Sequence, residues 1–276
     1  MLRLMLTCHP GLVVPPECGF IIWLQPGFGR WNGSDFADAG KVSGFADAVC
    51  DARKFDTWKL SREDVRQAVL SSRPDSYAAA CWAVYALFAS RCGKPHATWG
   101  DKNNYYLEHI TALKAIYPEA RFIHIVRDGR DVACSYRETM SRESDSPYRP
   151  ELPVSIDEIS RKWSRDIRMI QGQLAYLARE DKLETRYEDL VADPAGELAR
   201  ICAWLGVPFA ASMLDFHDIN RASMLEPDAT MDWKQRTLEP ASTGTVGRHA
   251  THFAAGEAEV FVANAGAQLR DYGYLD

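Results

Sequence analysis

Apolar residues recur every three to four positions along residues 155–180, with charged residues between them, which predicts a long amphipathic helix. Its apolar face would comprise Ile156, Ile159, Trp163, Ile167, Ile170 and Leu174. Capping residues and glycine or proline stops delimit the other predicted helices. These are expected over 61–72, 75–91, 104–117, 194–206 and 256–274, and the opening MLRLML also fits an amphipathic helix.

Short strand-like segments lie between these helices. RFIHIV at 121–126 is β-branched and has a helical pattern on each side, and weaker strand patterns occupy 182–190 and 95–102. Alternating strands and helices are typical of an α/β fold. We therefore expect a single α/β domain over 1–276, with a mainly parallel central sheet flanked by helices.

The composition is that of an ordinary globular protein, with 46% hydrophobic and 25% charged residues in 276. The net charge of −6 argues against nucleic-acid or anionic-membrane binding. The longest apolar stretch, Tyr77–Ser90, is too short for a membrane span and fits a buried helix. Seven cysteines without a C-x-x-C pair are typical of free thiols, so we expect a reducing, cytoplasmic location.

Ligands of parallel sheets bind beyond the carboxyl ends of the strands, so the functional residues are expected just after Trp99, Val126 and Thr185. After Val126, RDGRDVACSYRE places Arg127 at the strand end, an N-cap at Asp128 and Ser135 two turns along a helix. A guanidinium and a hydroxyl beside a helix N-terminus suit a phosphate. The alternative is a capped surface helix whose arginines pair with its own aspartates.

Two further charged residues are candidates for catalysis. Lys102 lies between a strand and a helix, where its charge can meet a leaving-group oxygen; the alternative is a solvated loop lysine. Glu17 follows Pro15 and Pro16, which restrict the backbone before the carboxylate. A glutamate held in this way can serve as a general base, and the alternative is an ordinary surface glutamate.

Three long stretches share their order and style with one family. They are LRLMLTCHPGLVVPPE, DKNNYYLEHITALKAIYPEARFIHIVRDGRDVACS and YEDLVADPAGELARICAWLGVPF. Over 1–24, 98–140 and 183–209 the chain resembles the sulfotransferases, in the branch that includes bacterial and protein-tyrosine sulfotransferases. The resemblance implies a P-loop nucleoside-triphosphate-hydrolase-like sulfotransferase fold. It also implies transfer of the sulfuryl group of 3′-phosphoadenosine-5′-phosphosulfate (PAPS) to a hydroxyl or amine by in-line displacement.

The resemblance further implies roles for individual residues. Glu17 is similar to the family's catalytic base, and Lys102 to the lysine beside the transferred sulfuryl group. The residues similar to those that bind the nucleotide are Arg127 and Ser135 at the 3′-phosphate, Tyr187 in RYEDL and Arg248 in STGTVGRH. No metal is required, so His249 and His252 in HATH are expected to be loop or helix-cap residues, not a zinc pair.

The chain departs from the family pattern in two places. Asn103 and Asn104 follow Lys102 where the family often has Thr-Pro or Asn-Pro, which loosens the turn. The family's first strand and P-R-S-G-T-T phosphate loop have no counterpart before MLRLML. We expect a start codon assigned too late, with about 15–25 further residues upstream. The alternative is a degenerate, inactive paralogue. The chain as written is expected to bind PAPS poorly and to turn over little.

Other functions stay open at this point. A P-loop nucleotide kinase needs a G-K-[ST] loop and a magnesium-binding carboxylate, and neither appears. A nucleotide-binding or scaffold protein without catalysis is the non-enzymatic alternative. We expect a small-molecule, carbohydrate or protein acceptor, and a monomer or homodimer without nucleic-acid or membrane partners. The acceptor pocket is expected in the unmatched helical insert 30–95 and in 143–154, where the aromatic residues Trp31, Trp58, Tyr77, Trp82 and Tyr148 line a pocket or belong to the core.

Overall fold

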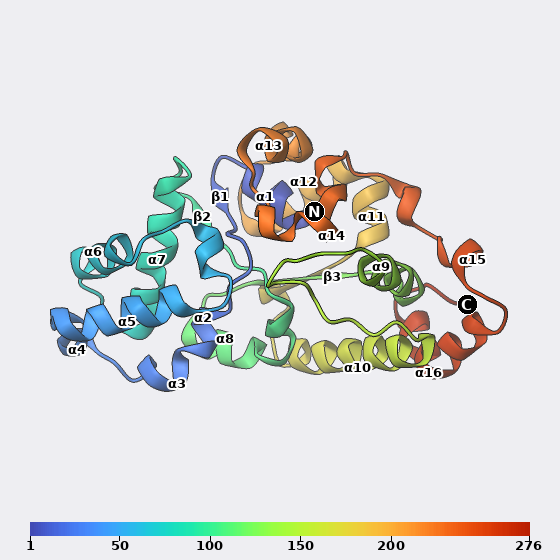
Figure 1. Cartoon of the computed structure of the whole chain (residues 1–276), viewed down its shortest axis with the longest axis horizontal. Helices are drawn as coiled ribbons and strands as arrows, with labels where there is room; N and C mark the ends of the chain where they lie inside the picture. Colours follow the sequence, from blue (N-terminus) through green and yellow to red (C-terminus); the bar gives the residue numbers. More distant parts are fainter. The chain divides into compact units, whose positions relative to one another are not determined.

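The computed structural model describes residues 1–276, which divide into two compact units. Unit 1 comprises Met1–Ala120 and Phe209–Pro227, and unit 2 comprises Arg121–Pro208 and Asp228–Asp276. Most helices and strands of both units are labelled in Figure 1. A single domain over 1–276 stays a prediction. No helix is both long and apolar enough to cross a membrane.

Unit 1 is mostly helical and contains one pair of short strands (Figure 1). Its helices are α1 (Leu2–Cys8), α2 (Phe20–Trp23), α3 (Gln25–Phe28), α4 (Gly33–Ala37), α5 (Ala39–Asp51), α6 (Arg62–Ser72), α7 (Tyr77–Arg91), α8 (Ile110–Ile116) and α13 (Phe216–Ser223). Short 3-10 helices occupy Phe55–Trp58, Asn104–Glu108 and Ala211–Met213. The strands β1 (Leu12–Val13) and β2 (Thr98–Trp99) pair in parallel. The segment 30–95 is mostly helical, with α4 to α7 in it.

Side-chain caps determine where the helices of unit 1 begin. Ser61 accepts a hydrogen bond from the Asp64 backbone N–H and caps α6, as predicted. Ser76 caps α7 in the same way, so that helix begins at Tyr77, two residues later than we expected. The expected helix over 104–117 is interrupted at His109, and the two parts are a 3-10 helix and α8.

The Asn103 side chain explains how the turn after Lys102 is closed without a proline. Its Oδ1 atom accepts a hydrogen bond of 3.0 Å from the Tyr105 backbone N–H. Asn103 is therefore the N-cap of the 3-10 helix Asn104–Glu108. Our expectation of a loosened turn was wrong at this point, because a side-chain cap substitutes for the fixed backbone angle of proline.

The core of unit 1 is built around aromatic rings. Phe20 lies 5.6 Å from Tyr85 and 5.8 Å from Trp58, measured between ring centroids. Trp58 and Tyr77 are both buried, and the Tyr77 hydroxyl donates to the Ile21 carbonyl at 2.8 Å. These two aromatic residues of the 30–95 segment therefore belong to the core, and the alternative that they line an open pocket is wrong.

Unit 2 contains one pair of longer strands, and each strand is followed in the sequence by helices (Figure 1). Its helices are α9 (Gly129–Ser141), α10 (Ile156–Ala175), α11 (Tyr187–Ala192), α12 (Pro194–Leu205), α14 (Met231–Lys234), α15 (His249–His252) and α16 (Glu257–Asp271). Short 3-10 helices occupy Arg179–Asp181, Asp228–Thr230, Gln235–Leu238 and Thr243–Thr245. The strands β3 (Phe122–Val126) and β4 (Lys182–Arg186) pair in parallel, with Val126 opposite Arg186. The predicted parallel pairing is confirmed, and the four strands form two two-stranded sheets, one in each unit.

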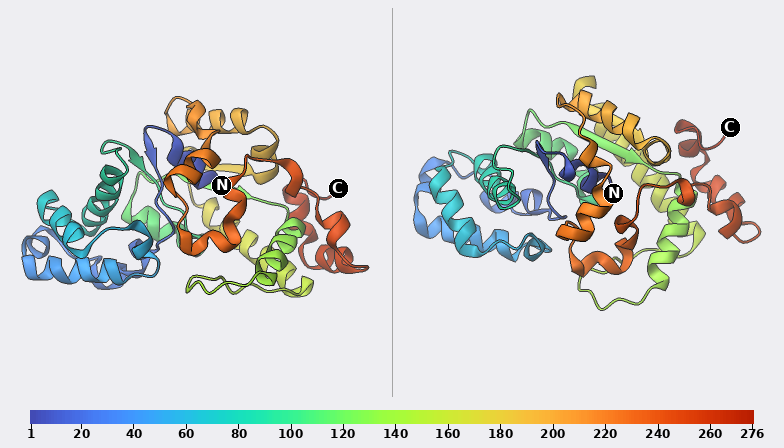
Figure 2. Two further views of the ribbon diagram at one scale, coloured as in Figure 1. Left: turned by 45° about the horizontal axis from the view of Figure 1, so that its top comes forward. Right: turned by 90° about the horizontal axis from the view of Figure 1, so that it is seen from above.

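The predicted amphipathic helix is α10, which ends at Ala175 rather than at 180. It lies alongside α16, as Figure 2 also shows. Trp163 of α10 and Phe261 of α16 are buried in the core of this unit. They also explain Gly129 at the first position of α9, because a Cβ there would come within 2.5 Å of Trp163 and 2.7 Å of Phe261. Glycine therefore lets α9 start against the core.

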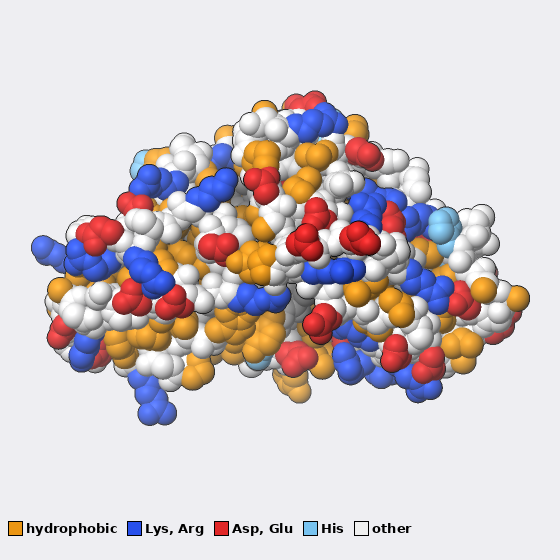
Figure 3. Space-filling model, viewed as in Figure 1, with side chains coloured by type: hydrophobic (Ala, Val, Ile, Leu, Met, Phe, Trp, Pro, Cys, Tyr) orange, Lys and Arg blue, Asp and Glu red, His pale blue; other side chains and the backbone are white.

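Acidic and basic side chains are interspersed over the face of the molecule drawn in Figure 3. This mixture agrees with the small net charge of −6 and leaves no broad basic surface on that face. We therefore look for anion binding in particular groups of basic side chains and not in a positive electrostatic potential spread over the surface.

Candidate functional site

In unit 1, the parallel pairing of β1 and β2 brings their carboxyl ends together, since Val13 lies opposite Trp99. Glu17 follows β1 and Lys102 follows β2, and the Lys102 Nζ atom donates to Oε1 of Glu17 in an ion pair. The structure thus brings together Glu17, which we predicted as a general base held by two prolines, and Lys102, which we predicted after a strand, where its charge can meet a leaving-group oxygen.

A second lysine, Lys54, completes this group. Its Nζ atom donates to Oε2 of Glu17 at 2.8 Å. The side chains of Glu17 and Lys54 are 17% and 18% exposed, whereas that of Lys102 is 45% exposed. The Trp58 indole N–H donates to the Pro16 carbonyl at 2.9 Å and holds the backbone before the glutamate. Each carboxylate oxygen of Glu17 therefore accepts a hydrogen bond from a lysine ammonium group. Lys54 is the inner, more buried lysine and Lys102 the outer, more exposed one.

Asp101 anchors the loop that carries Lys102. Its Oδ2 atom accepts hydrogen bonds from the hydroxyls of Tyr85 at 2.6 Å and Tyr106 at 2.5 Å. Its Oδ1 atom accepts from the Lys102 backbone N–H at 2.7 Å. Burial raises the pKa of Asp101 to about 6, although the hydrogen bonds from both tyrosines act to lower it. The residue before Lys102 is thus fixed to the aromatic core.

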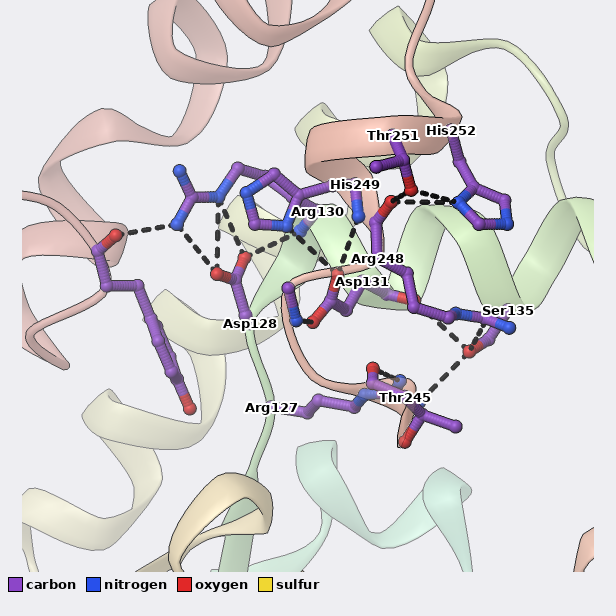
Figure 4. Close-up of polar contacts among 12 residues, drawn as sticks. Arg127, Asp128, Arg130, Asp131, Ser135, Thr245, Arg248, His249, Thr251 and His252 are labelled. Carbon is purple, nitrogen blue, oxygen red and sulfur yellow. Dashed lines mark hydrogen bonds and ion pairs between the residues drawn. The ribbon is translucent and has the colours of Figure 1, made fainter. Parts of the chain in front are cut away.

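In unit 2, the register of β3 and β4 places the residues that follow them side by side. Arg127 follows Val126 and Tyr187 follows Arg186, and the Arg127 guanidinium lies over the Tyr187 ring at 4.5 Å. Arg127 Nη1 donates to the Ser135 hydroxyl at 3.0 Å (Figure 4). The pairing of strand-end arginine and helix hydroxyl that we expected from their spacing is therefore present.

A segment far away in the sequence closes over this pair. Arg127 Nη2 donates to the Thr245 carbonyl at 2.8 Å, and the Tyr187 hydroxyl is 2.8 Å from Oγ1 of Thr245. Arg248, from the same segment, directs Nη2 to the Ser135 hydroxyl at 3.4 Å (Figure 4). Unit 2 therefore brings all four predicted nucleotide-binding residues into one connected group, in which Arg127 and Arg248 contact Ser135 and Tyr187 contacts Arg127.

Asp131 of α9 fastens this segment by its backbone. Its carboxylate accepts hydrogen bonds from the N–H of Gly247 at 2.6 Å and of His249 at 3.0 Å, on either side of Arg248. Its Oδ1 atom also lies 2.9 Å from Nδ1 of His249 (Figure 4). Burial alone would raise the pKa of Asp131, but the hydrogen bonds from His249 and Gly247 hold it below its usual value. His249 is thus a helix-terminal residue engaged by a carboxylate.

The alternative of a surface helix with aspartate–arginine pairs is correct in one part and wrong in another. Asp128 caps α9 by accepting from the Arg130 N–H and pairs with the Arg130 side chain at 2.7 Å. Asp131, by contrast, is buried and holds a distant backbone segment rather than an arginine. The sequence of α9 gave no sign of that long-range partner.

Three arginines in this region, Arg127, Arg186 and Arg248, have a buried Nε atom without a hydrogen-bond partner, and two of them are predicted nucleotide-binding residues. The Nε atoms of Arg127 and Arg248 are buried and make no hydrogen bond. Buried N–H groups are normally satisfied, so these two are suited to an anion that brings its own acceptors. A pocket of about 490 Å³ includes Arg248 but not Arg127 in its wall, and it is lined by Cys134, Arg137, Glu138, Ser141, Arg236, Arg248 and His252.

The sequence profile of the sulfotransferase family matches residues 1–211. The chain belongs to the sulfotransferase family. Its matched part includes the strand ends of both units and α9, and the Arg248 segment lies beyond it.

Relatives and solved structures agree with this assignment. Protein-tyrosine sulfotransferase 1 of Danio rerio is 30% identical over 131 residues, which are 46% of this chain and 34% of that protein. The chain spans less than half the length of the curated relatives it matches. The sulfotransferase domain of the Synechococcus PCC 7002 olefin synthase has a TM-score of 0.59 at 22% identity and covers 97% of this chain and 88% of that domain. The sulfotransferase domain of the curacin biosynthetic pathway has a TM-score of 0.54 at 18% identity, with 96% and 92% covered. The predicted α/β sulfotransferase fold is confirmed by these similarities.

We did not predict three residues from the sequence. Lys54 belongs to the charged group around Glu17, and Thr245 and Glu138 belong to the group around Arg127 and Arg248. Lys54 lies in the segment that we could not match, and its contact with Glu17 depends on a left-handed turn at Lys54 with φ of 70°. Thr245 contributes mainly its backbone carbonyl, which no sequence pattern reports. Glu138 carried a usable signal, because it lies one turn beyond Ser135 on the same helix.

Proposed function

We propose that this chain is a sulfotransferase that moves the sulfuryl group of PAPS to a hydroxyl or amine acceptor. Membership of the family and the sulfotransferase fold support the reaction class. The observation that carries the proposal is the convergence of Arg127 and Arg248 on Ser135, with a buried, unpartnered Nε on each arginine. Such N–H donors suit the acceptor oxygens of a phosphate group.

In this proposal the 3′-phosphate of the donor binds between Arg127, Ser135 and Arg248. A phosphomonoester carries a charge of about −1.5 to −2 at pH 7 and three acceptor oxygens. The two Nε–H groups supply donors of matching kind. The Ser135 hydroxyl donates to the Asp131 carbonyl at 3.1 Å and would become a third donor by turning from that carbonyl to the phosphate. Tyr187 would lie beside the nucleotide, where its ring already supports the Arg127 guanidinium. The donor is a substrate of the reaction, and its charge is met by side chains of the protein.

The proposed chemistry uses the charged group of unit 1. The acceptor oxygen attacks sulfur, a new O–S bond forms, and the bond from sulfur to the phosphate oxygen breaks. The acceptor proton goes to Glu17, and 3′-phosphoadenosine-5′-phosphate leaves with the electron pair. Because both oxygens of Glu17 are occupied by lysines, one must withdraw first, and the half-exposed Lys102 is the better candidate than Lys54. Lys102 would then stabilise charge on the departing oxygen.

The acceptor is proposed from the relatives alone. The curated relatives are named protein-tyrosine sulfotransferases, so a tyrosyl hydroxyl in a peptide is the first acceptor to try. A carbohydrate or small-molecule hydroxyl is the alternative. A cytoplasmic location and a monomeric or homodimeric state stay predictions.

The proposal is tested by binding of two isomeric nucleotides. Adenosine 3′,5′-bisphosphate and adenosine 5′-diphosphate carry the same groups, but only the former has a 3′-phosphate. Calorimetric titration without magnesium should give at least tenfold tighter binding of the 3′,5′-isomer. Arg127→Met should weaken that isomer by about 100-fold, since charged hydrogen bonds are lost, and leave the other nearly unchanged.

The matched control is Arg62→Met in unit 1, because Arg62 pairs with aspartates on an exposed surface. It should leave both affinities unchanged. Equal affinity of the wild-type chain for the two isomers would rule the proposal out. Preference for the 3′,5′-isomer without sulfuryl transfer from PAPS to a tyrosyl peptide would instead favour the non-catalytic nucleotide-binding alternative.

A further inference from the structure

The face of α9 that meets the Arg248 segment carries three polar residues at positions 131, 135 and 138. This spacing places Asp131, Ser135 and Glu138 on one side of a helix. Asp131 binds the backbone on both sides of Arg248, and Ser135 contacts its guanidinium. Glu138 is the third member of this stripe, and the proposed sulfuryl transfer gives it no role.

Glu138 is the acceptor for several arginines at once. Its Oε2 atom accepts from Arg248 Nη1 at 2.8 Å and from Arg236 Nη2 at 3.1 Å. Its Oε1 atom accepts from Arg142 Nη2 at 2.8 Å. Burial raises the pKa of Glu138, but the arginines outweigh it and hold the value at about 2. Glu138 is therefore a charged carboxylate throughout the physiological range.

The way in which Glu138 binds Arg248 leaves one edge of the guanidinium without a close acceptor. Glu138 takes Nη1, whereas Nη2 makes only the 3.4 Å contact with Ser135 and Nε is buried without a partner. Nε and Nη2 form one edge of the planar guanidinium, and that edge can bind an oxyanion with two parallel hydrogen bonds. The Arg248 side chain is only 11% exposed, so its rotamer depends on these contacts.

We propose that Glu138 is a positioning residue that fixes Arg248 from the Nη1 side and so presents its Nε–Nη2 edge, beside Ser135, to the 3′-phosphate of the nucleotide. This inference rests on the proposed function. Glu138 itself does not touch the ligand. If Glu138 acted as an anion that competes for the arginines of the pocket, it would weaken phosphate binding. As a positioning residue it strengthens phosphate binding. Removing its charge therefore changes the nucleotide affinity in opposite directions under the two roles.

The decisive experiment compares two isosteric variants, Glu138→Gln and Glu257→Gln. Glu257 pairs with Arg137, another arginine of the same pocket, and makes no contact with Arg248. Calorimetric titration with adenosine 3′,5′-bisphosphate should show about tenfold weaker binding in Glu138→Gln and a change of less than twofold in Glu257→Gln. The affinity for adenosine 5′-diphosphate should be unchanged in both variants.

A double-mutant cycle with Arg248→Met separates positioning from general damage. If Glu138 acts through Arg248, adding Glu138→Gln to Arg248→Met should have no further effect on affinity for the 3′,5′-isomer. Independent, multiplicative losses would overturn the inference, and so would binding by Glu138→Gln that equals or exceeds that of the wild-type chain. If Glu138→Gln does not fold, Glu138→Asp, which keeps the charge but shortens the side chain, should show the same selective loss.

The two proposals fail in different ways. A wild-type chain that does not prefer the 3′,5′-isomer contradicts the proposed function and, with it, the role of Glu138. A wild-type chain that does prefer it, with an Arg127→Met variant that does not, supports the function. Under that result, an unchanged affinity of Glu138→Gln overturns the positioning role alone.

Discussion

The two units place opposite arrangements of charge at the ends of similar strand pairs. In unit 1 a single carboxylate, Glu17, is bound on both oxygens by Lys54 and Lys102. In unit 2 the guanidinium groups of Arg127 and Arg248 meet a hydroxyl, a carbonyl and a carboxylate, yet keep a buried Nε each without an acceptor. In unit 1 both oxygens of the carboxylate accept hydrogen bonds from lysines. In unit 2 the buried Nε–H donors of Arg127 and Arg248 have no acceptor.

This difference indicates what each group is suited to do. A carboxylate saturated by lysines can exchange one of them for a proton donor, which is the behaviour expected of a general base with an adjacent cation. Buried donors without acceptors are costly unless a ligand supplies the acceptors. Under the proposed function, the residues after β1 and β2 would handle the proton, and those after β3 and β4 would bind the anion.

The largest expected effect separates these two assignments. Glu17→Gln removes the proton acceptor but keeps the shape of the side chain. Sulfuryl transfer from PAPS to a tyrosyl peptide should fall by about 10²-fold or more, the usual contribution of a general base. The affinity for adenosine 3′,5′-bisphosphate should stay within twofold of wild type. A full rate in Glu17→Gln, or a matching loss of nucleotide affinity, would contradict the division of roles.

The second prediction uses the opposite pKa shifts of two aspartates, one in each unit. The pKa of Asp101 is raised to about 6, so its carboxyl binds a proton more tightly in the folded state than in the unfolded one. Its contribution to the free energy of unfolding should therefore fall as pH rises from about 4 to about 6, by about 2–3 kcal/mol. The pKa of Asp131 is lowered, so its contribution is present above the unfolded pKa of about 3.9 and is lost as pH falls.

Urea unfolding of the wild-type chain, Asp101→Asn and Asp131→Asn between pH 3.5 and 7 checks both signs. Relative to wild type, Asp101→Asn should gain stability with rising pH, and the deficit of Asp131→Asn should shrink on acidification. Differences of the same sign for both variants would show that the two carboxyl groups do not have the contrasting environments described here.

Much of this arrangement was predictable where it depends on local sequence. The helix expected over 194–206 is α12, which ends before Gly206 with its left-handed φ of 76°, and β3 follows RFIHIV closely. Arg127 and Ser135 were brought together by a strand end and two helical turns, which the spacing encodes. The parallel register of β3 and β4 then accounts for Tyr187 beneath Arg127.

The remainder depends on contacts between distant segments, which local patterns do not encode. The strand β1 is only two residues long and lies outside the three strand-like segments expected from the sequence. Asp131 finds its partners in the backbone of residues 247–249, and a main-chain donor leaves no mark in the sequence. Lys54 has a left-handed backbone conformation at the start of the 3-10 helix Phe55–Trp58, and this conformation accompanies its contact with Glu17.

The smallest expected effect tests how firmly the unit 1 carboxylate is held. Lys54→Met removes the inner, largely buried partner of Glu17 but preserves most of the apolar stem. It should lower the free energy of unfolding by about 1 kcal/mol and the melting temperature by about 2–4 °C. Arg62→Met, whose ion pairs with Asp47 and Asp51 are exposed, should leave the melting temperature unchanged. If the two variants behaved alike, Lys54 would be no more than another surface cation, and the contrast between a saturated carboxylate in unit 1 and open donors in unit 2 would rest on Lys102 alone.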